Sequence, residues 1–164
     1  MRVIRLRFLG FSLVELVVVA LILGVIASTA LPRFSRGSEG VADAALAGNL
    51  AVLRNGLDLY ASDHAGNYPS VANFEAQMTE YTDEKGNTST VQDSTHTRGP
   101  YLRKVPLLPV GPKGFRGASA VLDAATAKIG AEPGAWIYNP KTGEIHANLD
   151  FRLEDYSGKR YNQY

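Results

Sequence analysis

The sequence contains no cysteine and little that points to catalysis. Because none of the 164 residues carries a thiol, disulfides, thiolate metal sites and a cysteine nucleophile are excluded. The three histidines, His64, His96 and His146, lie far apart without metal-binding spacing, and residues 111–114 lack the spacing of a phosphate-binding loop. No local serine-nucleophile motif is present. We therefore expect a protein that is not an enzyme, with each histidine at the surface or in a sheet.

An excess of charge of one sign is also missing. The chain has 17 basic and 16 acidic side chains, a formal net charge of +1, and three of the arginines fall within the first ten residues. The remaining lysines and arginines are scattered, so the basic face of a dedicated nucleic-acid binder is absent from the sequence. We expect no nucleic-acid partner.

An apolar run near the N-terminus is the most informative feature that is present. Residues 16–31 include no charged side chain. A helix over residues 11–34, with ~1.5 Å rise per residue, would cross a hydrocarbon core of ~30 Å. Because three arginines precede the run, the positive-inside rule places the first ten residues in the cytoplasm and the rest of the chain outside. The pattern predicts a single membrane-spanning helix.

One carboxylate, Glu15, stands at the start of this apolar stretch. An ionised carboxylate at bilayer depth costs roughly 3 kcal/mol on insertion scales, so such a residue indicates a functional site with a partner, here an amine. Two simpler interpretations use the same residues. A secretory signal peptide would be cut after Ala30 and would leave Glu15 unexplained. An uncut membrane anchor would merely tolerate Glu15 near the interface.

The run Gly10-Phe11-Ser12-Leu13-Val14-Glu15 resembles the cleavage site and N-terminal helix of type IV pilins and of the pseudopilins of type II secretion systems. The resemblance implies that a prepilin peptidase cuts between Gly10 and Phe11 and that Phe11 becomes N-methylated. It also implies that Glu15 attracts the terminal amine of Phe11 in a neighbouring subunit during assembly.

Three further phrases resemble major pseudopilins: Leu57-Asp58-Leu59-Tyr60, Asn67-Tyr68-Pro69 and Pro100-Tyr101-Leu102. Many type IV pilins close a C-terminal loop with a disulfide, which a cysteine-free chain cannot form. The resemblance therefore favours the pseudopilin branch, and implies a structural subunit of a protein-transport filament. The alternatives are a type IV pilus subunit for adhesion, motility or DNA uptake, and a membrane-anchored periplasmic binding domain that does not polymerise.

The partners implied by the resemblance are those of filament assembly. They are further copies of the chain in a helical homopolymer, the prepilin peptidase, minor pseudopilins, and an inner-membrane assembly platform with its ATPase. The implied location is the bacterial inner membrane, crossed once, with a periplasmic C-terminal domain that joins a periplasmic pseudopilus after assembly.

The domain organisation follows from these assignments. Residues 1–10 are a leader peptide, residues 11–34 a hydrophobic assembly helix, and residues 35–164 an amphipathic continuation of the helix with a periplasmic globular domain. Gly24 and Pro32 are predicted kink points because proline removes a helical hydrogen bond, although Gly24 also suits close helix packing in a membrane. The expected fold class is α+β, a pilin fold whose long helix packs on a small antiparallel sheet.

Periodicity places the elements of this domain. Apolar residues at spacings of three and four predict an amphipathic helix with one buried stripe: Leu46, Leu50, Leu53, Leu57 and Tyr60. The opposite positions should face solvent: Asp43, Asn49, Arg54 and Asp58. Glycine and asparagine within residues 62–67 favour a helix end there and a chain reversal at Tyr68-Pro69.

The rest of the domain is predicted to be short elements. Residues 74–81 form a second helix with Asn73 as its N-cap, and residues 82–99 form an exposed loop. Prolines keep the segment after residue 105 irregular. Two β-prone runs, 136–138 and 144–149, flank turn residues and predict a hairpin. One more strand is expected at 118–122 or 151–153.

No cofactor is expected. Major pseudopilins commonly bind one Ca²⁺ in a C-terminal loop, and Asp150, Glu154 and Asp155 could supply hard oxygen ligands. The acidic loop pattern of the family is not recognisable in this sequence, however, and three acids within six residues are more often a solvated tail. The predicted metal ligands are therefore none.

Overall fold

The computed structural model describes residues 12–150, 152–155, 158–161 and 164, with the side chains of residues 29–39 outside the description. The chain divides into two compact units, Met1–Ser38 and Glu39–Tyr164. The elements in chain order are α1 (Leu13–Asp63), α2 (Phe74–Thr79), β1 (Tyr81–Thr82), β2 (Thr88–Ser89), β3 (Val121–Asp123), β4 (Trp136–Tyr138) and β5 (Ile145–Ala147). The fold class is α+β.

The helix α1 is 51 residues long and ends where the sequence predicts. Beyond its last residue, Ala65 and Gly66 take positive φ angles of 54° and 84°. The Gly66 N–H donates to the Ala61 carbonyl at 2.8 Å, which satisfies one of the carbonyls left free at a helix end. The helix is uninterrupted at Gly24 and Pro32, and the kink predicted there stays a prediction.

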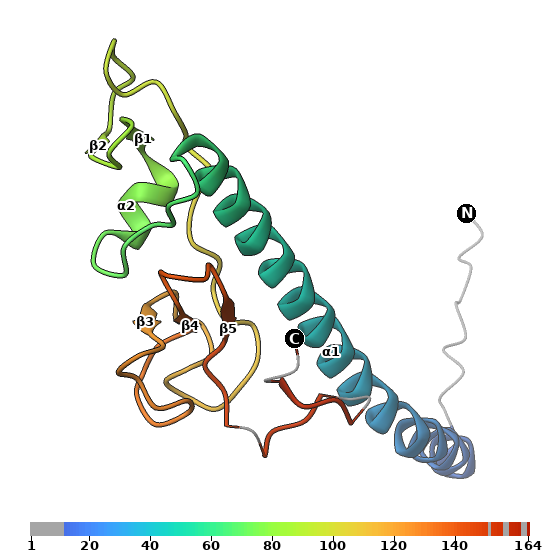
Figure 1. Ribbon diagram of the computed structural model, residues 1–164. Coiled ribbons are helices and arrows are strands. Elements are labelled where there is room, and N and C mark those ends of the chain that lie inside the picture. The colour runs from blue at the N-terminus through green and yellow to red at the C-terminus, as the bar shows by residue number, and fades with distance from the viewer. Residues whose placement is uncertain (1–11, 151, 156–157, 162–163) are drawn as a thin grey trace, which may run out of the picture. The chain divides into compact units, whose positions relative to one another are not determined.

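The predicted apolar stripe of α1 forms the core of the unit Glu39–Tyr164. Its five members are between 0% and 2% exposed: Leu46, Leu50, Leu53, Leu57 and Tyr60. They belong to one cluster with residues of β4, β5 and α2, among them Trp136, Tyr138, Ile145 and Met78. Within this unit, Figure 1 shows β3, β4 and β5 beside α1, and α2, β1 and β2 gathered nearer its C-terminal end. Burial of this leucine-rich face therefore stabilises the helical conformation of α1 in this unit.

The main sheet has the order β3-β4-β5 and is mixed. The predicted hairpin is confirmed, because β4 and β5 pair antiparallel with Ile137 opposite His146. The expected antiparallel sheet is wrong for the third strand, since β3 pairs parallel to β4 with Leu122 opposite Ile137. A parallel pair needs a crossover. That crossover is residues 124–135.

The buried Asn148 holds the crossover in place. Its amide nitrogen donates to the carbonyls of Glu132 and Gly134 at 2.8 and 3.2 Å, and its amide oxygen accepts from the Gly130 N–H at 2.8 Å. The side chain is 0% exposed. A helix usually joins parallel strands, but this crossover contains none. The three hydrogen bonds of one buried amide stabilise it instead.

The region after α1 differs from prediction in three places. α2 ends at Thr79 rather than at Tyr81, and Asn73 occupies the N-cap position without a side-chain capping bond. The segment expected to be a loop includes an antiparallel pair, β1 with β2. Its Thr82 is fully buried. The chain reversal is confirmed, because Tyr138 Oη donates to the Pro69 carbonyl at 2.9 Å.

Asp43, predicted to face solvent, and His64, predicted to lie at the surface or in a sheet, are both buried outside any strand. Asp43 is 8% exposed and accepts a hydrogen bond from Tyr161 Oη at 2.7 Å. His64 is 3% exposed, with both ring nitrogens on backbone carbonyls. In each case at least one polar partner lies far along the chain, Tyr161 for Asp43 and the Asp83 carbonyl for His64, and the hydrogen bond offsets the cost of burial.

Candidate functional site

The N-terminal part of α1 is the first candidate site, because it is apolar and exposed. Every residue from Ser12 to Ser28 is exposed. Eleven of these are large hydrophobic residues with exposed fractions between 47% and 80%: Leu13, Val14, Leu16, Val17, Val18, Val19, Leu21, Ile22, Leu23, Val25 and Ile26. Contiguous apolar surface of this extent marks an interaction site.

The hydrogen bonds within this segment are local. The Leu16 N–H donates to the Ser12 carbonyl at 3.1 Å, which closes the first turn, and Ser28 Oγ donates back to the Val25 carbonyl at 2.7 Å. A Cβ added to Gly24 would have no neighbour within 4 Å. The surface at Gly24 is therefore open to close approach by another helix.

Glu15 lies in the first turn of α1. A carboxylate in that position is favoured by the positive end of the helix dipole, by about 0.3–1 kcal/mol when exposed. Among the residues that the structure describes, none forms an ion pair with Glu15. The carboxylate is thus exposed, flanked by apolar side chains, and able to accept an amine from outside this copy of the chain.

The other predicted site residues lie partly beyond the description. Gly10 and Phe11, the proposed cleavage pair, are outside the described residues, as is the side chain of Pro32. Within the described ranges, no helix has both the length and the mean hydropathy that a membrane crossing requires.

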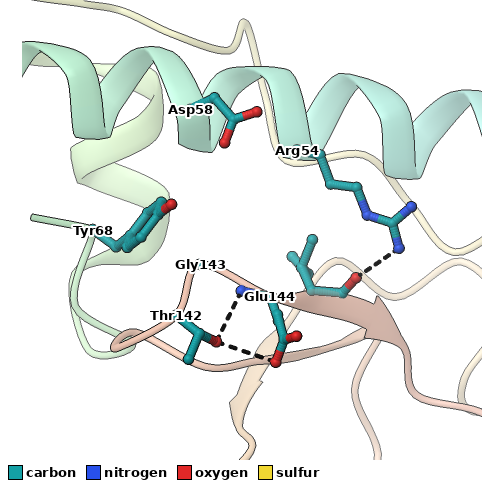
Figure 2. A pocket seen from close by; sticks show the side chains of 7 residues that line it. Arg54, Asp58, Tyr68, Thr142, Gly143 and Glu144 are labelled. Carbon is teal, nitrogen blue, oxygen red and sulfur yellow. Dashed lines mark hydrogen bonds between the residues drawn. The ribbon is translucent and has the colours of Figure 1, made fainter. Parts of the chain in front are cut away.

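A second candidate is a pocket of about 230 Å³ between α1 and the β4–β5 turn. Figure 2 shows Asp58 and Arg54 on α1 across from the turn that carries Thr142 and Glu144, with the Arg54 side chain directed at the Ile145 carbonyl. Arg54 donates to the carbonyl of Ile145 at 3.1 Å and to that of Tyr164. Glu144 accepts from Thr142 Oγ1 at 3.2 Å.

The polar groups of this pocket stabilise the fold. Its cation, Arg54, is used to hold the backbone of β5 and of the C-terminal residue against α1. Two carboxylates, Asp58 and Glu144, also line the pocket, and Glu144 is already bonded to Thr142 in the β4–β5 turn. Among the lining residues there is no histidine and no serine or cysteine nucleophile. We assign no reaction to it.

The acidic residues near the C-terminus are separately engaged. Asp150 accepts from the Arg152 N–H at 2.9 Å, Glu154 lies 3.9 Å from Arg160, and Asp155 accepts from the Lys159 N–H at 2.8 Å. In the described part of the chain, no three histidine, aspartate or glutamate side chains gather as a metal ion would need.

One tyrosine ties the C-terminal segment to α1, and a second braces the segment itself. Tyr161 Oη donates to Asp43 on α1, and Tyr164 Oη donates to Asp155 within the segment. Burial and the Asp43 carboxylate raise the pKa of Tyr161 well above its usual range. The hydrogen bond to Asp155, followed by burial, raises the pKa of Tyr164 to about 12. Both hydroxyls therefore remain protonated donors at neutral pH.

Sequence reasoning missed this tether, because no local pattern links residues 118 positions apart.

Comparisons with protein-family models, with curated proteins and with solved structures give no match to this chain.

Proposed function

We propose that the chain is a structural subunit of a type II secretion pseudopilus, with a pilin fold, which polymerises into a helical filament after prepilin peptidase removes residues 1–10. The observation that carries the proposal is the exposed apolar surface of α1 from Leu13 to Ile26, with Glu15 in its first turn. The sequence Gly10-Phe11 immediately before it supports the same conclusion.

The physics of assembly follows from this surface. Before assembly, the bilayer would cover the apolar side chains; in the filament, the same helix from other subunits would cover them. Moving between two apolar surroundings costs little hydrophobic free energy, so packing and specific polar contacts decide the register. The open surface at Gly24 allows close helix contact there.

Glu15 supplies the specific contact. In the assembled state its carboxylate would be removed from water, which is costly for an unpaired charge. The new N-terminal amine of Phe11 in an adjacent subunit offsets that cost, and their attraction strengthens as the surrounding dielectric constant falls. The pairing therefore favours one axial position of each subunit relative to the next.

Filament yield from Glu15 variants tests the proposal. We expect Glu15→Ala and Glu15→Leu to reach the membrane in normal amounts but to enter sheared or overexpressed filaments poorly. Glu75→Ala, which removes an exposed glutamate from α2, is the matched control and should assemble normally. Normal filament yield from both Glu15 variants would refute the assigned role.

Processing is tested separately. Gly10→Glu should block cleavage and leave the full precursor in the membrane, whereas unchanged cleavage would exclude the proposed site. Electron microscopy distinguishes the alternatives after assembly: long surface fibres at native expression would indicate a type IV pilus subunit instead of a secretion subunit.

A further inference from the structure

His64 makes two contacts that a neutral imidazole cannot make together. Its Nδ1 lies 2.8 Å from the Tyr60 carbonyl oxygen, and its Nε2 lies 2.9 Å from the Asp83 carbonyl oxygen. A carbonyl oxygen only accepts hydrogen bonds, and a neutral imidazole has one N–H and one bare nitrogen. Either neutral tautomer would thus place a nitrogen lone pair against a carbonyl oxygen. The imidazolium form satisfies both contacts.

The ring of His64 packs against two tyrosine rings. The His64 ring is stacked on Tyr60, with centroids 3.8 Å apart and planes 10° from parallel, and lies edge-on to Tyr101 at 6.2 Å. A cation over a tyrosine face is attracted by the ring. Asp63 adjoins His64 in the chain and accepts from Tyr101 Oη at 3.0 Å. The titratable side chains in contact with the ring are those of Tyr60 and Tyr101. Asp63 and Asp83 adjoin it along the chain or through the backbone, and His96 lies near enough to help lower the pKa of the Asp83 carboxyl.

The hydrogen bond between His64 and the Asp83 carbonyl joins two segments that lie 19 residues apart in the sequence. Asp83 begins a tight turn, in which its N–H donates to the Asn87 carbonyl at 3.1 Å and its carbonyl accepts from the Gly86 N–H at 3.2 Å. The Asp83 side chain is occupied inside the same turn by Asn87 and the Lys85 N–H. His64 therefore connects the end of α1 to the turn that links β1 and β2.

We infer that His64 is a proton-dependent clamp, which holds the turn of residues 83–87 on the end of α1 when doubly protonated and loosens it when neutral. Histidine is the side chain whose charge ordinarily changes between pH 5 and 8. Losing one proton leaves a ring-nitrogen lone pair against the carbonyl oxygen of Tyr60 or of Asp83. Either repulsion displaces the ring from its position between the two carbonyls, so the turn opens more often at the higher pH. Gln77 Nε2, which donates to the Gly86 carbonyl at 2.8 Å, keeps the turn attached, so the expected change is local.

The clamp lies within one copy of the chain, so this inference does not depend on the proposed assembly. Hydrogen exchange of the full-length chain in detergent micelles, corrected for intrinsic rates, tests it. We expect the protection of the Asp83 and Gly86 amides to fall about tenfold from pH 5.5 to pH 8, as expected for losing a hydrogen bond to a charged group. Equal protection at the two pH values would overturn the inference.

Two variants separate His64 from the other titrating groups nearby. His64→Gln has no titrating ring, so its turn should show the same protection at both pH values. His96→Gln is the matched control, since His96 pairs with Asp93 in the same region; it should retain the pH dependence. Loss of the dependence in His96→Gln alone would refute the role of His64.

Ring ¹⁵N chemical shifts of the wild-type chain provide a readout that needs no variant. Two N–H groups on His64 at pH 5.5 and one at pH 8 are the expected result. A single protonated ring nitrogen at pH 5.5 would overturn the inference, even if His64→Gln fails to fold.

Discussion

Replacing Leu53 by alanine tests whether the buried stripe of α1 holds the globular unit together. Leu53 is 0% exposed and belongs to the main core cluster. The change removes three carbons, worth about 0.8 kcal/mol each, or about 2.4 kcal/mol in transfer free energy. A residual cavity of about 40 Å³ adds about 1 kcal/mol. We expect the free energy of unfolding to fall by about 3 kcal/mol.

Leu59→Ala is the matched control, because it makes the same chemical change on the same helix where the leucine is 59% exposed. We expect a change within about 0.5 kcal/mol for this variant, as for other surface substitutions. The contrast between the two leucines thus isolates burial from helix propensity.

Trp136 supplies the assay. It is the only tryptophan in the sequence, is 0% exposed, and shares the core cluster with Leu53. Its fluorescence therefore reports unfolding of that core during denaturant titration of the full-length chain in detergent. At about 4 °C per kcal/mol for a domain of roughly this size, the Leu53→Ala melting temperature should fall by about 12 °C. Equal losses from Leu53→Ala and Leu59→Ala would refute the reasoning.

Three further predictions concern the same globular unit. Tyr161→Phe should cost about 1–3 kcal/mol of stability, because it leaves the buried Asp43 without that hydroxyl donor; an unchanged denaturation midpoint would contradict this. Gly143→Ala should destabilise more than Gly66→Ala, since both glycines have positive φ but only the Cβ at 143 would meet the ring of Tyr68; equal melting temperatures would exclude the clash. Burial raises the pKa of Tyr101 to about 12, so its contribution to stability is complete below pH 10 and lost as pH rises from 10 to about 12; a pH–stability curve of Tyr101→Phe with the same slope as wild type there would argue against it.

The parts of the fold that sequence predicts are those with a local pattern. The stripe from Leu46 to Tyr60 repeats every three or four residues, and only one face of a helix can bury such a set. The β4–β5 hairpin is similarly local, because its turn residues lie between two β-prone runs.

The parts that sequence does not predict depend on distant partners. The sequence pattern predicts that Asp43 faces solvent, whereas in the structure it is buried and accepts a hydrogen bond from Tyr161. The parallel pairing of β3 depends on a crossover without helical periodicity, held by the single side chain of Asn148. The sequence predicts His64 at the surface or in a sheet, whereas in the structure its ring is buried against the Asp83 carbonyl. Each case needs tertiary contacts that residue spacing does not encode.

The candidate site also has a part that the sequence predicts and a part that only the structure shows. Glu15 and the apolar residues around it can be singled out from sequence, because a charge in an apolar run is unusual wherever it occurs. The exposure of the described residues from Ser12 to Ser28 is a structural result. Together they make this surface the basis of the proposed assembly.

The measurement that tests the central claim most directly is the mass of the mature chain and of its N-terminal peptide, from protein isolated from the native membrane. The account predicts a chain that begins at N-methylated Phe11. A chain beginning at Leu31 would indicate a secreted soluble domain, and one retaining Met1 or Arg2 would indicate an uncut anchor; either result would contradict the account, because the amine that Glu15 is proposed to meet would be absent.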